Sequence, residues 1–156
     1  MASRRSKLSN LILVVLAALS ALPAAAVAAT RAKDLESLAR FQQFAGEPVD
    51  RIRSFTLTDW RSLGPTHLAV WRGPRDAWLI RVAEPCLGLE FAHTIGLTTS
   101  GGTVSARFDR IEFRDSLGSS RREQCRIEEI RVVDYPKVRE AERAARKATA
   151  QASGGT

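Results

Sequence analysis

Asp76-Ala-Trp-Leu-Ile-Arg-Val-Ala-Glu-Pro-Cys-Leu-Gly-Leu-Glu-Phe91 is the stretch of sequence that decides the fold. Two short apolar runs flank a Glu-Pro turn and the cysteine Cys86, and we expect both runs to be strands. The second cysteine, Cys125, lies in another strand-like run. We expect a Cys86–Cys125 disulfide, which would close a loop of about 40 residues and stabilise the fold by about 4 kcal/mol. The alternative is a pair of free, buried thiols.

The first 29 residues have the three-part order of a secretory signal peptide. Three basic residues precede an apolar run from Leu8 to Leu22, Pro23 interrupts it, and alanines follow. Cleavage after Ala26, Ala28 or Ala29 fits this order, and we favour the last two. The run is short for a membrane span, although an uncleaved anchor is the alternative. The sequence therefore predicts a periplasmic or secreted protein, in a compartment where two cysteines form a disulfide.

Charge is distributed unevenly along the chain. The whole sequence has a net charge of +7, but the segment from Asp34 to Asp134 has 14 arginines, no lysine and 15 acidic residues. The basic surplus therefore lies in the two ends of the chain. A nucleic-acid-binding domain would carry its surplus on the folded face, so we expect no nucleic-acid partner.

Residues 30–135 are long enough for a single domain with its own core. Residues 33–45 predict a helix, because Leu35, Leu38, Phe41 and Phe44 recur at helical spacing. From there to Val133 the apolar period is that of strands.

Thr103–Phe113 and Gln124–Val133 are the longest predicted strands, joined by a polar loop. The apolar residues of each change parity once, at Asp109-Arg110 and at Glu128-Glu129. A one-residue slip turns every later side chain over, so each position predicts a bulge or a sheet corner. Strands that bend in this way are typical of strongly curled sheets. The predicted fold is α+β, mainly β: a curled antiparallel sheet or small open barrel of six to seven strands with one N-terminal helix.

Residues 136–156 form a basic, alanine-rich tail. Pro136 suits a first helical turn, but the apolar stripe is too small to bury much surface. We expect a polar, exposed C-terminal helix that gives way to a disordered end.

The sequence does not identify an activity. It contains no specific set of nucleophile and base, we expect no cofactor, and zinc is disfavoured because a disulfide removes the thiolates. The sequence offers two weaker candidate sites. The first is an anion- or glycan-binding site near a hairpin tip, where guanidinium groups would recognise the anion; its residues are Arg72, Arg75, Arg81, Trp71 and Trp78.

The second candidate is an acidic site at the two parity switches, made of Asp109, Glu128 and Glu129. If the two long strands pair, these carboxylates would converge on a cation or act as an acid/base pair. The structural alternative is that the residues satisfy backbone groups at bulges. For the arginines and tryptophans of the first site, the alternative is an ordinary solvated strand face.

A set of landmarks spread from about Leu38 to Asp134 resembles a family of small exported proteins of Gram-negative bacteria, catalogued as a domain of unknown function. The resemblance implies periplasmic export, a β-rich domain and a paired cysteine, but no activity. The landmarks are Phe44-Ala-Gly-Glu-Pro-Val49, Trp60, Val70-Trp71, Trp78-Leu79, Cys86-x-Gly88-Leu89, Ile95-Gly-Leu-Thr98, Phe108-Asp109, Cys125-Arg-Ile127 and Asp134.

Our leading hypothesis is an exported, non-catalytic binding or accessory module of the cell envelope, with an envelope protein or glycan as its partner. A second hypothesis is an enzyme that uses Asp109 with Glu128 or Glu129. A third is a module held at the envelope surface by its basic tail, which would touch the membrane only peripherally.

Overall fold

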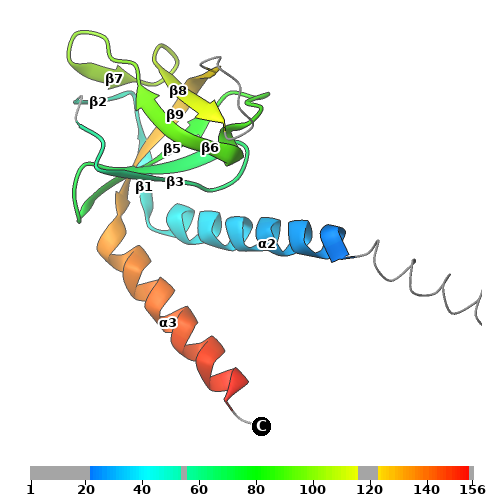
Figure 1. Ribbon diagram of the computed structural model, residues 1–156. Coiled ribbons are helices and arrows are strands. Elements are labelled where there is room, and N and C mark those ends of the chain that lie inside the picture. Colours follow the sequence, from blue (N-terminus) through cyan, green and yellow to red (C-terminus); the bar gives the residue numbers. More distant parts are fainter. Residues whose placement is uncertain (1–21, 54–55, 116–122, 155–156) are drawn as a thin grey trace, which may run out of the picture. The chain divides into compact units, whose positions relative to one another are not determined.

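The computed structural model describes residues 22–53, 56–115 and 123–154. Residues 34–156 form one compact unit and residues 1–33 form another. Antiparallel strands dominate the described part of the chain (Figure 1), so the fold is mainly β, as predicted. In chain order the elements are α2 (Leu22–Gln43), β1 (Ala45–Val49), β2 (Arg51–Arg53), β3 (Asp59–Ser62), β4 (His67–Trp71), β5 (Asp76–Val82), a 3₁₀ turn (Leu89–Phe91), β6 (Ala92–Leu97), β7 (Thr103–Ser105), β8 (Arg110–Asp115), β9 (Glu123–Asp134) and α3 (Tyr135–Ser153).

The sheet is organised around β9, which pairs with three other strands. One edge of β9 pairs with β5, and the opposite edge pairs first with β8 and then with β1. The strand order is β3-β4-β5-β9-β8-β6, with β1 off this path. These strands curl into a nearly closed, barrel-like sheet (Figure 1), which confirms the predicted fold class. Strands β2 and β7 form a separate two-stranded sheet.

Strands β4 and β5 are buried on both faces, which explains why their sequences are nearly continuous apolar runs. Alternate side chains enter two separate core clusters. The inner cluster lies inside the curled sheet and includes Val70, Trp78 and Ile80. The outer cluster includes Trp71 and Leu79 on the opposite face of the same strands.

The helices cover the outer cluster. Phe41 of α2 and Val138 of α3 are both fully buried in it. The ring of Phe41 meets Trp71 edge-on at 5.9 Å between centroids, and Trp71 meets Tyr135 at 5.1 Å. The apolar spacing of the predicted helix therefore reflects packing on the sheet, except at Leu35, which is exposed.

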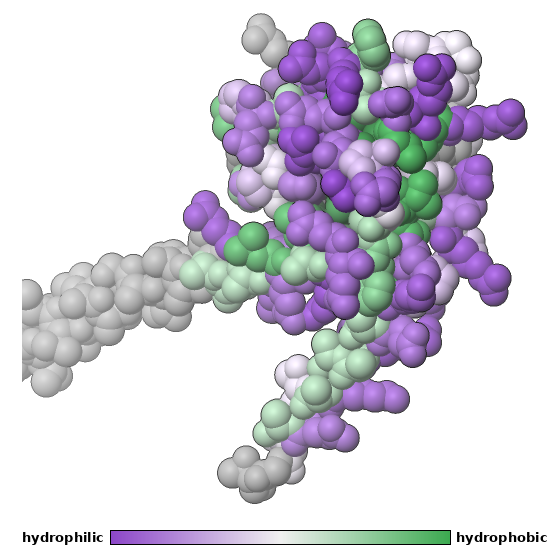
Figure 2. Space-filling model, turned by 180° about the vertical axis from the view of Figure 1, so that it is seen from behind, coloured by the Kyte–Doolittle hydropathy of each residue, from purple (hydrophilic) through white to green (hydrophobic). Residues whose placement is uncertain are grey.

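The helix boundaries differ from the predicted ones. The N-terminal helix runs from Leu22 to Gln43 rather than over residues 33–45, and Ala45 already belongs to β1. α3 continues to Ser153, and its start is anchored because Asp134 accepts a hydrogen bond from the backbone N–H of Lys137. Figure 2 shows weakly hydrophobic residues along one side of α3 and hydrophilic ones along the other. No helix within the described ranges combines the length and the apolar character that a membrane crossing requires.

The Cys86–Cys125 disulfide is present, as predicted, with the two Cα atoms 5.7 Å apart. Both cysteines are buried in the inner cluster. The bond ties the segment that follows β5 to the beginning of β9. It therefore links two parts of the curled sheet that are 39 residues apart in sequence.

One of the two parity switches is a β-bulge. Arg81 of β5 is in register with Glu129, whereas the next residue, Val82, is in register with Ile127. Glu128 is therefore an extra residue in β9, as the change of parity at Glu128-Glu129 predicted.

The other parity switch is a break between strands rather than a bend within one. The predicted strand Thr103–Phe113 is wrong as a single element, because β7 ends at Ser105 and β8 begins at Arg110. Between them Arg107 adopts a left-handed backbone conformation with φ of 70°. Such a residue cannot continue a strand, and the two halves join different sheets.

The predicted strand Cys86–Phe91 is also wrong. Gly88 has a φ of 87° and a 3₁₀ turn follows it. Leu89 alone among the three apolar residues is buried, while Leu87 is 81% exposed and Phe91 is 54% exposed. The alternation of apolar residues here reflects one anchoring leucine in a turn, not the face of a strand.

We predict that replacing both Cys86 and Cys125 with alanine lowers the free energy of unfolding by about 4 kcal/mol, because the unfolded chain gains the entropy of a 39-residue loop. Urea denaturation of the oxidised protein and of the double variant measures the difference. Equal unfolding midpoints, or two cysteines that react with a thiol reagent without reductant, would contradict the predicted role of the bond.

Candidate functional site

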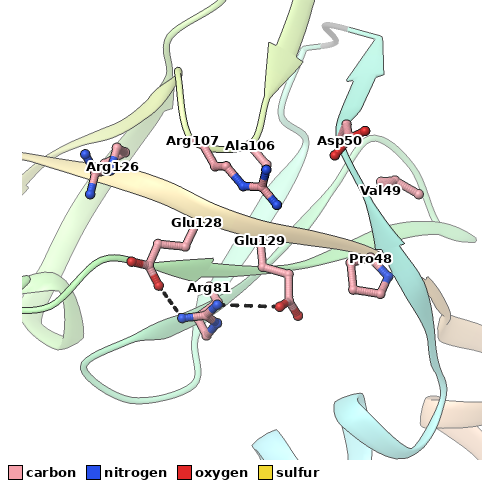
Figure 3. Close-up of a pocket in the computed structure, with 9 residues that line it drawn as sticks. All are labelled: Pro48, Val49, Asp50, Arg81, Ala106, Arg107, Arg126, Glu128 and Glu129. Carbon is pink, nitrogen blue, oxygen red and sulfur yellow. Dashed lines mark hydrogen bonds and ion pairs between the residues drawn. The ribbon is translucent and has the colours of Figure 1, made fainter.

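The bulge in β9 places two consecutive carboxylates opposite one arginine. In a regular strand Glu128 and Glu129 would point to opposite faces, but at a bulge two residues face a single partner. That partner is Arg81, whose Nη1 donates a hydrogen bond to Glu128 and whose Nη2 donates one to Glu129 at 3.5 Å. Figure 3 shows both carboxylates directed toward the Arg81 guanidinium.

A second arginine completes this ion-pair network. Nε of Arg131 donates to Oε1 of Glu129 at 2.5 Å, and its Nη1 donates to the carbonyl of Gly46 at 3.3 Å. The hydrogen bond from Arg131 lowers the pKa of Glu129 below its usual value of 4.5, and the charges of Arg131 and Arg81 lower it further. Glu129 is therefore ionised at neutral pH and already neutralised by its neighbours.

An open cavity of about 540 Å³ lies at the bulge, and we call it the bulge cavity. Six of the residues that line it are charged, three acidic and three basic (Figure 3). Its lining residues are Pro48, Val49, Asp50, Arg81, Ala106, Arg107, Arg126, Glu128 and Glu129.

Two lining arginines differ from Arg81, because Arg107 and Arg126 form no ion pair within residues 22–53, 56–115 and 123–154. Both are exposed, and Figure 3 shows them as separate from the Arg81 pairs. The cavity thus combines the paired groups Arg81, Glu128 and Glu129 with two guanidinium groups and the carboxylate of Asp50, none of which forms an ion pair within the described residues.

The backbone around Arg107 is fixed by hydrogen bonds. Its N–H donates to the carbonyl of Ile127 at 2.6 Å, and the N–H of Ala106 donates to the carbonyl of Asp50 at 2.8 Å. These bonds hold the left-handed Arg107 against β9, where its side chain enters the bulge cavity. A non-glycine residue in this conformation stores strain that the surrounding structure must hold, and such residues cluster at functional sites.

Asp109 is not brought together with the two glutamates. It is buried, it does not line the bulge cavity, and its carboxylate accepts three hydrogen bonds. Oδ1 accepts from the hydroxyls of Thr98 at 3.0 Å and Ser100 at 3.2 Å, and Oδ2 accepts from the N–H of Ser105 at 2.7 Å. The carboxylate therefore joins the turn before β8 to the segment that follows β6.

The arginine and tryptophan site proposed near the hairpin tip is not assembled as one site. Trp71 and Trp78 lie in separate clusters on opposite faces of the sheet. Arg72 bonds to Asp76 and lies over the ring of Trp78 at 5.7 Å, whereas Arg81 belongs to the glutamate network. Arg75 is exposed and forms no ion pair in the described part of the chain.

A second cavity, of about 410 Å³, shares Arg81 and Glu129 with the bulge cavity. His67 lines it, and burial, followed by the charge of Arg81, lowers the pKa of His67 below 6.5. No group of three or more His, Cys, Asp or Glu residues in the described ranges is arranged to hold a metal ion. The second cavity therefore presents a neutral imidazole near neutral pH.

The sequence pattern does not single out Arg107, Arg110 or Arg126. Their grouping depends on the register of the sheet, since Arg110 of β8 is directly opposite Arg126 of β9. Neither residue stands out by itself, because arginines are common on exposed strand faces.

A model of the family of unknown function DUF6491 matches residues 7–149. Comparisons with curated proteins and with solved structures found no match.

Asp109 generates a prediction that separates a structural role from a catalytic one. Asp109→Ala leaves two hydroxyls and one backbone N–H without their acceptor, so we expect a loss of about 2–4 kcal/mol in the free energy of unfolding. Urea denaturation measures it. Glu47→Ala is the control, because Glu47 is exposed and forms no ion pair within the described residues. Unchanged stability, together with a hydrolase activity that Asp109→Asn abolishes, would reverse the assignment.

Proposed function

The chain belongs to the family of unknown function DUF6491, and we propose that it is an exported, non-catalytic binding module of the cell envelope that holds its ligand in the bulge cavity. The observation that supports the proposal is that some charged side chains of this cavity are engaged in ion pairs and others are not. Its glutamates are already paired, whereas Arg107 and Arg126 form no ion pair in the described part of the chain.

Binding fits these residues better than acid–base catalysis. A general acid at neutral pH needs a raised pKa, whereas the pKa of Glu129 is lowered by Arg131 and Arg81. Asp109, the other carboxylate of the rival enzyme hypothesis, is occupied by three hydrogen bonds outside the cavity. A ligand that pairs with the two available guanidinium groups requires no rearrangement of the network.

Two observations support export. The first 29 residues have the order of a secretory signal peptide. The Cys86–Cys125 bond is compatible with an oxidising compartment, where disulfides persist. We therefore propose that the mature protein is periplasmic or secreted, with cleavage after Ala28 or Ala29.

We predict that the protein, expressed from its full-length sequence in the native host, is recovered in the periplasmic or extracellular fraction with Thr30 or Ala29 as its first residue. N-terminal sequencing of the recovered protein tests this. An intact N-terminus in the cytoplasmic fraction would contradict export.

The same recovered protein, immobilised, tests binding. We expect an envelope component to be retained by the wild type and by Arg75→Glu, which changes an exposed arginine outside the cavity. The Arg126→Glu variant should no longer retain the component, because a carboxylate would then replace the guanidinium group that faces the ligand. Identical retention by all three proteins would exclude the bulge cavity as the binding site.

A further inference from the structure

We propose that Arg107, Arg110 and Arg126 form a binding site for a phosphoryl group at the β8–β9 side of the bulge cavity. This inference deepens the proposed function and rests on it, because it names the chemical class of the ligand that the cavity takes.

The first observation is a pair of like charges in direct register. Arg110 of β8 is opposite Arg126 of β9, so their side chains leave the same face of the sheet. Cβ atoms of directly opposite residues lie about 5 Å apart, and like charges there destabilise the sheet. Neither arginine forms an ion pair with any residue that the structure describes. An anion between them would relieve the repulsion.

The second observation is that Arg107 is held beside this pair. Its N–H bonds to the carbonyl of Ile127, the residue next to Arg126, and Arg107 and Arg126 line the same cavity. The left-handed conformation of Arg107 is unfavourable for a residue with a side chain. The turn therefore retains a strained backbone that places a third arginine on the wall of the cavity that Arg126 also lines.

The third observation is the contrast with Arg81 in the same cavity. Arg81 is neutralised by Glu128 and Glu129, so it adds no positive potential to the wall. Of the three lining arginines, Arg107 and Arg126 are therefore the two that no described acidic residue pairs with, and Asp50 adds one carboxylate to the same lining. An anionic ligand would bind there and leave the glutamate network intact.

Three guanidinium groups favour a phosphoryl group over a carboxylate. Each guanidinium offers a planar fork of N–H donors, which matches the oxygens of a phosphate in bidentate fashion. A carboxylate has two oxygens and one charge, so it can satisfy one such fork fully. A phosphate monoester has three terminal oxygens and close to two negative charges at neutral pH.

The phosphoryl group has two possible sources, a soluble phosphate ester or a phospholipid headgroup. Phe108 distinguishes them, because it follows Arg107 in the same turn and is 81% exposed. Aromatic rings next to basic residues are typical of segments that bind a membrane surface, so a lipid source would give the exposed ring of Phe108 a partner. A soluble ester makes no use of it.

The test measures the binding of two probes to the protein that is expressed from its full-length sequence and recovered after export. Binding of glycerol 3-phosphate is measured by calorimetry. Binding to vesicles is measured by co-sedimentation, using phosphatidylcholine with added phosphatidic acid, whose headgroup is a phosphate monoester, and phosphatidylcholine alone. The variants are Arg126→Gln and Arg107→Asn, because asparagine tolerates the left-handed conformation. Arg75→Gln is the control of equal charge, and urea midpoints confirm that every variant folds.

We expect at least one probe to bind, and either site variant to weaken that binding at least about tenfold, as for a lost charge-assisted hydrogen bond. Arg75→Gln should bind as the wild type does. Phe108→Ser should weaken vesicle binding alone if the source is a lipid, and glycerol 3-phosphate should bind regardless of Phe108 if the source is soluble.

Binding of neither probe would overturn the inference. So would binding that Arg75→Gln weakens as much as the site variants, or vesicle binding that disappears only when residues 137–156 are deleted, because the basic tail would then hold the anion. An envelope component that is retained through Arg126 while neither probe binds would leave the proposed function intact and remove only the phosphoryl assignment.

Discussion

The extra residue in β9 is the constraint on which the rest of the structure depends. β9 pairs with β5 on one edge and with β8 and β1 on the other, so a change in its register affects most of the sheet. The additional glutamate at position 128 lets Ile127 and Ile130 both reach the inner core. In a regular strand those two residues, three positions apart, would face opposite sides. The bulge therefore keeps both isoleucines on the inner face while β9 stays paired with β5. It also directs Glu128 and Glu129 toward Arg81.

The sequence carried enough information for the fold class and for this bulge. Core residues of a strand recur at even spacing, so an odd spacing between isoleucines marks an inserted residue. The disulfide was also predictable, because a chain with two cysteines has only one possible pairing. Backbone conformation was less accessible. The turn at Gly88 interrupts what the apolar pattern presents as a continuous strand, because period-2 alternation persists when a single side chain, Leu89, anchors the turn. At Arg107 the parity change indicated an irregularity, but it did not show that the chain leaves one sheet for another.

Residues of the candidate site were only partly predictable. Arg81, Glu128 and Glu129 were selected, but Arg81 was assigned to a different group because nothing in the sequence states which strand lies beside β5. Asp109 was assigned to the acidic site by its position at a parity switch, yet the break after β7 turns its carboxylate toward the hydroxyls of Thr98 and Ser100. Register, which joins residues far apart in sequence, decides which charges meet.

Deletion of Glu128 tests the central claim most directly. The shortened strand should keep Ile127 and Ile130 on the inner face, so we expect one cooperative urea transition and an intact disulfide, with a lower midpoint because the local twist is lost. Deletion of Arg126 is the matched comparison, because it must turn either Cys125 or Ile127 out of the core, and we expect it to abolish the transition. If deletion of Glu128 abolishes the transition as completely as deletion of Arg126 does, Glu128 is not an inserted residue and the bulge is not the organising constraint.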